Sequence, residues 1–275
     1  MKTILVPVDF SDCSHNAYMY ALDMAAAMQF EVVLFHNVFP NQGLDNNAYS
    51  AFFIEDFLAI KEEKLKEYIS DALQKDKYRS LKLRYQLEVG FTIPGIVKAL
   101  EDNNVELIVM GTTGASGLKE MTLGSTTGSV IANTKVPLMA IPPTAKFDQL
   151  NTNFVFASDF TRDINVFSVE CLQSLADYKK ANVTVLHVLE PKEEQPNTAE
   201  IEAQMSSILG HLSHNFHFIE DRSTAKAINI FVQSVDASLL CMLAHQRDFF
   251  SKIFYTSTTK LVSHHLSVPL LVMHE

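Results

Sequence analysis

The stretch that decides the fold is residues 105–142, VELIVMGTTGASGLKEMTLGSTTGSVIANTKVPLMAIP. Residues 107–110 form a short apolar run rich in β-branched side chains, which predicts a strand buried on both faces. A glycine-containing loop follows. A helical pattern then covers 128–134, and a second apolar strand covers 136–141. The unit is strand, loop, helix, strand, which is the repeating unit of a parallel sheet.

The loop of this unit has the chemistry of an anion site. Gly111 ends the first strand and Gly114 follows in the loop, so backbone N–H groups there can approach an anion without an intervening Cβ. The hydroxyls of Ser125 and Thr126 come where a helix begins, and the free N–H groups and dipole of that helix favour phosphate oxygens. The alternative is that the glycines serve only turns and that Ser125 only caps a helix. Spacing alone leaves both readings open.

Neither common phosphate motif is present, because the sequence contains no G-x-x-x-x-G-K-[ST] and no G-x-G-x-x-G. The pattern is instead G-x2-G-x9-G-[ST]. Together with ILVPVDFS at 4–11 and VLFHNV at 33–38, this pattern resembles the universal stress protein family, in its ATP-binding subgroup. The three segments follow in the family's order over about one domain length. Asn37 departs from the family, which usually has Val at that position.

The resemblance implies an ATP pocket with Mg²⁺, an ion that needs only a carboxylate plus phosphate oxygens. Asp9 would face the ribose or the phosphates through this metal, and no metal site made of protein ligands alone is expected. The residues implied around adenine and ribose are Pro7, Val8, Asn37, Val38 and Met110. Those implied around the phosphates are Gly111, Thr112, Gly114, Gly124, Ser125 and Thr126.

The first half of the chain alternates strands and helices. Strands are expected at 2–8, 31–38 and 81–89, and helices at 14–28, 54–73 and 92–101, with Thr92 as the cap of the last helix and a polar loop over 39–50. This order predicts an α/β fold with a doubly wound, five-stranded parallel sheet. The family resemblance implies that this unit is Rossmann-like and similar to the adenine nucleotide alpha hydrolases. Ligands of such sheets bind beyond the carboxyl ends of the strands, where Asp9, Asn37 and Gly111 should meet.

The second half repeats the first. Residues 153–161 echo the opening strand and its Asp-Phe, 183–188 echo 33–38, and 268–272 echo 136–140. We therefore expect two tandem domains, 1–145 and 146–275. The resemblance implies that their last strands pair within the chain as an intramolecular pseudo-dimer.

The loop chemistry is lost in the second copy. Leu243, Gln246 and Thr256 replace the three glycines, so one nucleotide is expected per chain, in the first domain. A different anion site at His245, Arg247 and Lys252 is the alternative.

Composition limits the partners. A formal net charge of −10 disfavours nucleic acid, and no apolar run is long enough to cross a membrane. Three scattered cysteines and a short apolar start favour a reducing, cytoplasmic location. The histidines at 211, 214 and 217 lack a carboxylate or cysteine that would complete a metal site.

The residues favour a binding module over an enzyme. The expected function is an ATP-binding stress-response protein that acts on unknown protein partners and can form a homodimer. The alternatives are slow ATP hydrolysis, autophosphorylation at Ser125, Thr126 or Ser129, and a nucleotide-free scaffold. Phosphoryl transfer needs charge stabilisation and a base, and the sequence offers no evident base beyond Asp9.

Overall fold

A computed structural model describes residues 2–39, 50–112, 123–149, 151–158, 164–189, 197–244 and 268–274, with only the backbone of 50–54. The first half contains β1 (Thr3–Pro7), α1 (Asp12–Met28), β2 (Glu31–Val38), α2 (Ser50–Leu73), η1 (Asp76–Tyr78), β3 (Leu83–Val89), α3 (Thr92–Asp102), β4 (Val105–Gly111), α4 (Ser125–Asn133) and β5 (Leu138–Ile141). The second half contains η2 (Phe147–Gln149), β6 (Asn153–Ala157), η3 (Val166–Val169), α5 (Glu170–Lys179), β7 (Asn182–Leu189), α6 (Thr198–Leu209), β8 (His214–Glu220), α7 (Thr224–Ser234), β9 (Leu239–Leu243) and β10 (Leu270–Met273).

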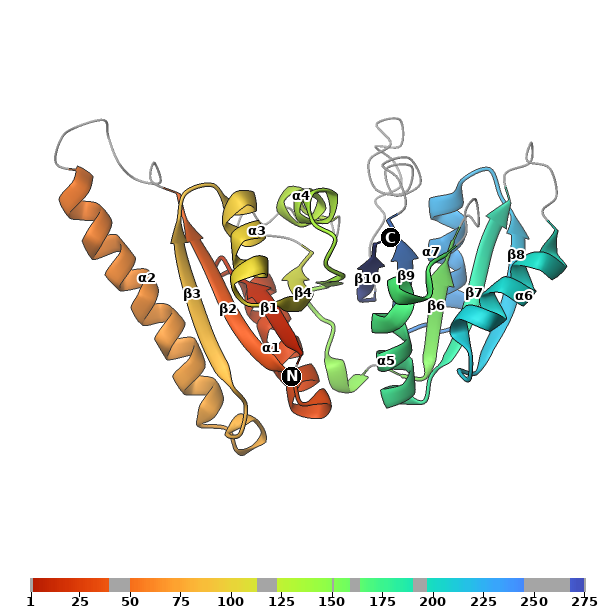
Figure 1. Cartoon of the computed structure of the whole chain (residues 1–275), viewed down its shortest axis with the longest axis horizontal. Helices are drawn as coiled ribbons and strands as arrows, with labels where there is room; N and C mark the ends of the chain where they lie inside the picture. Colours follow the sequence, from red (N-terminus) through yellow and green to blue (C-terminus); the bar gives the residue numbers. More distant parts are fainter. Residues whose placement is uncertain are drawn as a thin grey trace.

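The described strands form one ten-stranded sheet in the order β3-β2-β1-β4-β5-β10-β9-β6-β7-β8. All neighbours within each half are parallel, and only β5 and β10 are antiparallel, with Leu271 opposite Met139. The two five-stranded units therefore lie side by side with their last strands paired at the centre (Figure 1). This confirms the predicted fold and the intramolecular pairing of the two copies.

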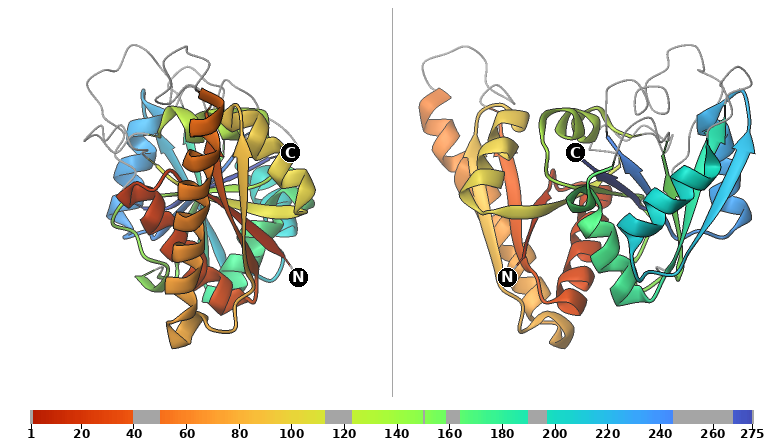
Figure 2. Two further views of the ribbon diagram at one scale, coloured as in Figure 1. Left: turned by 90° about the vertical axis from the view of Figure 1, so that its left-hand side faces the viewer. Right: turned by 45° about the vertical axis from the view of Figure 1, so that its right-hand side comes forward.

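Helices cover both faces of the sheet because the central strands are apolar on both sides. Along β1, Ile4 and Val6 pack in the cluster formed with α1, α2, α5 and α6, while Leu5 packs in the cluster formed with α3, α4 and α7. The long helix α2 runs along the outer edge beside β3 (Figure 2). Among the described residues no helix is long and apolar enough to cross a membrane.

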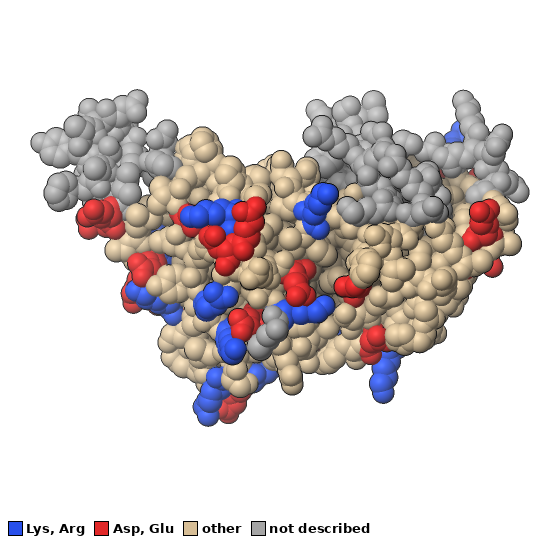
Figure 3. Space-filling model, viewed as in Figure 1, with Lys and Arg blue, Asp and Glu red and all other residues tan. Residues whose placement is uncertain are grey.

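Charged side chains of both signs are intermixed on the face seen in Figure 3, and acidic side chains often lie next to basic ones. The surface of the described residues also contains ion pairs, such as Lys66 with Glu62 at 2.8 Å. The net charge of −10 therefore does not appear as one acidic area on this face.

The element bounds differ from the sequence prediction at helix starts. Helix α1 begins at Asp12 with Ser11 as its N-cap, and α4 begins at Ser125 with Gly124 as its N-cap. The prediction that Thr92 caps α3 is wrong, because Phe91 is the N-cap and Thr92 is already the first helical residue. Residues 40–49, which make up most of the predicted polar loop, lie outside the described residues. The domain boundary at 145/146 falls between β5 and β6 and stays a prediction.

Candidate functional site

The candidate site lies at the carboxyl ends of three adjacent strands. β1 is hydrogen-bonded to both β2 and β4, so the ends of these strands, at Pro7, Val38 and Gly111, share one edge of the sheet. The pairing continues beyond β1, because the backbone N–H of Val8 donates to the carbonyl of Phe35 at 2.8 Å. Parallel strands thus bring together residues from three distant segments, as the alternation of strands and helices predicts. Gly114 lies outside the described residues.

Asp9 is held by the residues that cap α1. One carboxylate oxygen accepts from the backbone N–H of Ser11 at 3.0 Å and from its hydroxyl at 2.5 Å. The Ser11 hydroxyl oxygen in turn accepts from the backbone N–H of Ser14 at 3.2 Å, which satisfies one of the free donors of the first helical turn. Asp9 itself is exposed, so its carboxylate is oriented by the helix cap and still faces solvent at the strand edge.

Phe10 organises a cationic, aromatic neighbourhood beside Asp9. Its backbone is left-handed, with φ 64°, a conformation that residues with a Cβ rarely adopt. Its ring centroid lies 4.5 Å from that of His36, and the ammonium groups of Lys61 and Lys64 lie 5.1 and 5.6 Å from it. Sequence reasoning missed both lysines, because polar residues on α2 have the pattern of a solvated helix face. Only their contact with Phe10, more than fifty residues away, identifies them.

His36 is a satisfied buried residue. Its Nδ1 lies 2.7 Å from the carbonyl oxygen of Val8, and burial lowers its pKa below the ordinary value of histidine. The imidazole is therefore neutral around pH 7 and has a structural role. It fixes the end of β2 to the residue before Asp9.

The start of α4 is tied directly to the end of β4. The backbone N–H of Gly124 donates to the carbonyl of Thr112 at 2.6 Å, and the Thr127 hydroxyl donates to the carbonyl of Gly111 at 2.9 Å. These bonds leave the side chains of Ser125 and Thr126 exposed in the first turn of the helix. The arrangement presents hydroxyls and helix N–H groups next to a strand end, which is where phosphate oxygens bind in other sheets.

Gly111 is also required for packing. A Cβ built on it would lie 2.7 Å from Sγ of Cys13 and 3.1 Å from the Cys13 carbonyl oxygen. The absence of a side chain lets β4 approach the first turn of α1. Gly111 therefore has a packing role that differs from both the turn and the phosphate interpretations, and this role is compatible with ligand binding at the same edge.

Two buried polar atoms at this edge have no hydrogen-bond partner among the described residues: Nδ2 of Asn37 and Oγ1 of Thr112. The Asn37 amide oxygen accepts from the Thr92 hydroxyl at 3.1 Å, so Thr92 contacts β2 in place of the predicted cap. An unpaired buried donor costs free energy, and a bound polar ligand would remove that cost.

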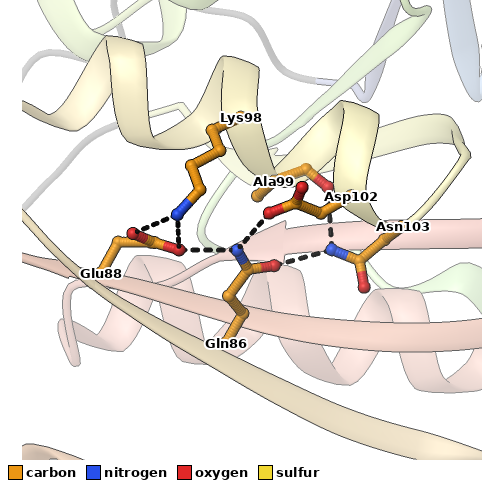
Figure 4. A network of polar contacts seen from close by, with 6 residues as sticks. All are labelled: Gln86, Glu88, Lys98, Ala99, Asp102 and Asn103. Atoms are coloured by element: carbon orange, nitrogen blue, oxygen red, sulfur yellow. Dashed lines mark hydrogen bonds and ion pairs between the residues drawn. The ribbon is translucent and has the colours of Figure 1, made fainter.

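A polar network holds α3 in place beside Asn37 (Figure 4). Lys98 lies 3.0 Å from a Glu88 carboxylate oxygen, and Gln86 donates to Asp102 at 3.3 Å. Asn103 donates to the amide oxygen of Gln86 at 2.7 Å. The network links β3 to the same helix whose first turn contains Thr92.

The second half repeats the histidine contact but not the glycine. His187 Nδ1 lies 2.9 Å from the carbonyl oxygen of Ser158, matching His36 and Val8. Leu243 is 1% exposed at the end of β9, where the first half has Gly111. Asp159, Gln246, Thr256 and the alternative anion site at His245, Arg247 and Lys252 lie outside the described residues.

His211 and His214, two of the three clustered histidines, have separate partners. His211 lies 2.7 Å from Asp177, and His214 lies 2.9 Å from the hydroxyl of Ser206. In the parts of the chain that the structure describes, no three histidine, cysteine or acidic side chains are placed to hold a metal ion together.

Comparisons with known proteins agree with the fold. The model of the universal stress protein family matches residues 1–142 and 168–274. Universal stress protein MJ0531 of Methanocaldococcus jannaschii is 31% identical over 144 residues, covering 51% of this chain and 81% of that protein. MJ0577 of the same organism is 28% identical over 152 residues, covering 51% of this chain and 94% of that protein. The crystal structure of a universal stress protein from Archaeoglobus fulgidus DSM 4304 covers 98% of this chain and 97% of its own, with a TM-score of 0.73 at 21% identity.

Proposed function

The chain belongs to the universal stress protein family, and on that premise we propose that its first half binds one ATP and acts as a cytoplasmic stress-response module. The observation that carries the proposal is the junction of β4 with α4. There the Gly124–Thr112 hydrogen bond holds the exposed hydroxyls of Ser125 and Thr126 at the same sheet edge as Asp9. Phosphates would bind at the α4 turn, together with Gly111 and Gly114.

The adenosine part would lie over the ends of β1 and β2. Pro7, Val8, Val38 and Met110 are the residues proposed to flank it, and Asn37 would offer its unpaired Nδ2 to the base or the ribose. A buried donor without a partner is a specific feature that an adenine nitrogen or a ribose oxygen could satisfy. Thr112, also unpaired, would face the phosphate side.

Mg²⁺ fits the donors at this edge. It is bound in most nucleotide sites by one or two carboxylates together with phosphate oxygens and water. Asp9 supplies an oriented, exposed carboxylate, and the ammonium groups of Lys61 and Lys64 add positive charge beside it. When bound, the ion would neutralise phosphate charge near Asp9.

Binding is favoured over catalysis. Phosphoryl transfer requires a positioned nucleophile and stabilisation of developing charge, which an arginine often provides. β1, β2, β4 and α4 contain no arginine. A signalling role through nucleotide binding, with an unidentified protein as the partner, needs no such group.

The test is to denature the purified protein, identify any released nucleotide by chromatography, and titrate the emptied protein with ATP and Mg²⁺ in a calorimeter. We expect one ATP per chain and at least tenfold weaker binding in Gly114→Gln, with Ala203→Gln on α6 as the matched surface control. No nucleotide and no heat would contradict the proposal. Release of many phosphates per chain, lost in Asp9→Ala, would favour the enzyme alternative.

A further inference from the structure

A hollow lies between the two halves, at the ends of the strands opposite to the candidate ATP site. Its volume is about 540 Å³, and it is lined by the starts of β1 and β4, the end of α1, and the first turns of α5. The proposed ATP site follows the last residues of β1 and β4, so the two sites do not share residues. A volume of this size is within the range of about 300–1,000 Å³ that is typical of small-molecule pockets.

The hollow has an apolar part, and its apolar side chains come from both halves. Met24, Met28 and Phe30 belong to the first half, and Phe167 belongs to the second. Phe167 is 76% exposed, an unusual state for a phenylalanine next to a concave apolar surface. A bound apolar group would cover this ring and the half-buried Met28 together.

The four charged side chains that line the hollow have a net charge of zero, but only two of them form an ion pair with each other. Lys2 and Glu106 form an ion pair at 3.4 Å. Lys135 and Glu170 also line the hollow, and neither forms an ion pair with any other residue that the structure describes. Lys135 precedes β5 in the first half and Glu170 opens α5 in the second. A ligand with one negative and one positive group would complement both.

We propose that this hollow binds a zwitterionic α-amino acid with a large apolar side chain. Its carboxylate pairs with Lys135, its ammonium group pairs with Glu170, and its side chain packs against Phe30 and Phe167. Because the two charged contacts come from different halves of the chain, the ligand bridges those halves. The proposal is independent of ATP binding at the other edge of the sheet.

Calorimetry with three matched probes tests it. Phenylalanine carries both charges, 3-phenylpropanoate lacks the ammonium group, and phenethylamine lacks the carboxylate. We expect phenylalanine to bind most tightly. Lys135→Met should weaken the binding of phenylalanine and 3-phenylpropanoate by about twofold to fivefold, which is the range expected for one exposed ion pair. It should leave the binding of phenethylamine unchanged. Glu170→Gln should weaken the binding of phenylalanine and phenethylamine and leave the binding of 3-phenylpropanoate unchanged.

The control variants are Lys226→Met on α7 and Glu202→Gln on α6, both exposed and outside the hollow. They should bind all three probes as the natural chain does. Ser174→Trp fills the hollow without changing its charge and should abolish binding, with thermal unfolding used to check that the variant folds. ATP titration of every variant should be unchanged.

Cys171 provides a second readout that does not depend on a variant. It lines the hollow and is partly exposed, whereas Cys13 and Cys241 are buried, so it should be the first thiol to react in the folded protein. Burial raises the pKa of Cys171 to about 12, so alkylation should be slow but measurable. Bound phenylalanine should slow the alkylation of Cys171. The proposal is overturned if phenylalanine gives no heat and no protection, or if it binds no better than its two singly charged analogues.

Discussion

At the residue scale, Gly111 shows why a glycine motif has two meanings. Its sequence position suggests that bare backbone is needed for a phosphate, while the structure shows that bare backbone is needed for the contact with Cys13, 98 residues earlier in the chain. Thr92 likewise has a role that its local sequence does not indicate. Its sequence pattern predicts a helix cap, but its hydroxyl donates a hydrogen bond to Asn37. Sequence patterns report local geometry, and these partners come from distant parts of the chain, Cys13 from α1 and Asn37 from β2.

Gly111→Ala should therefore destabilise the protein even without nucleotide. The added Cβ would meet Sγ of Cys13 at 2.7 Å and backbone atoms at 3.1–3.2 Å, and the backbone atoms cannot rotate away. We expect a loss of about 1–3 kcal/mol in the free energy of unfolding, measured by chemical denaturation of the nucleotide-free protein.

Gly95→Ala is the matched control for this change. Its Cβ would meet the ends of the Asn37 and Phe35 side chains at 3.3 Å and the Cβ of Glu88 at an ordinary contact distance of 3.8 Å. Alanine also favours the α3 helix. It should change stability by less than about 1 kcal/mol. Equal losses in the two variants would show that the contact with Cys13 is not the cause.

At the scale of elements, the strands and helices could be predicted well because apolar residues recur along them with a clear periodicity. β2 has the bounds that the sequence indicates, and the apolar runs of β1 and β4 are buried on both faces. What could not be predicted is how elements are fixed to one another. The polar side chains of β3 and α3 read as ordinary solvated positions, yet Gln86, Glu88 and Lys98 form the network that holds α3 against the sheet (Figure 4).

This network predicts a pH-dependent contribution to stability. Hydrogen bonds from Gln86 and Lys98 to the ionised carboxylate lower the pKa of Glu88. A lowered pKa means that the folded state favours the ionised form, so the stabilisation is present above the ordinary pKa of glutamate and is lost as the pH falls through the lower folded value. Glu88→Gln should therefore be less stable than the natural chain at pH 7, and the difference should shrink below about pH 4.

We expect this difference at pH 7 to be about 0.3–1 kcal/mol, because the carboxylate is partly exposed and screened by salt. Urea denaturation at several pH values measures it. Glu101→Gln, at an exposed position on α3, is the control and should show no such trend. A difference between Glu88→Gln and the natural chain that stays constant from pH 7 to pH 3 would show that ionisation of Glu88 does not stabilise the fold.

At the scale of the whole molecule, the repeat in the sequence predicted the architecture because each copy ends in an apolar strand. β5 and β10 are fully buried and pair antiparallel, so neither strand is an exposed edge. The interdomain hollow could not be predicted, because its lining comes from six separate segments that only the paired halves bring together. The edges that remain in the described sheet are β3 and β8.

Pairing within the chain predicts how the two halves behave when separated. Residues 1–145 expressed alone would expose β5, whose apolar edge would seek another strand. A second copy offers the same strand in the antiparallel direction that β10 occupies in the full chain. We therefore expect residues 1–145 to sediment as a dimer at micromolar concentrations where the full chain sediments as a monomer of 30.8 kDa.

Ala140→Lys, which places a charge on the fully buried strand, should make this fragment monomeric or unfolded. If the unsubstituted fragment is a folded monomer, β5 does not need a partner strand, and the central pairing cannot be what holds the two halves together. A full chain that dimerises at the same concentration would instead place a further interface at β3, β8 or the helical faces.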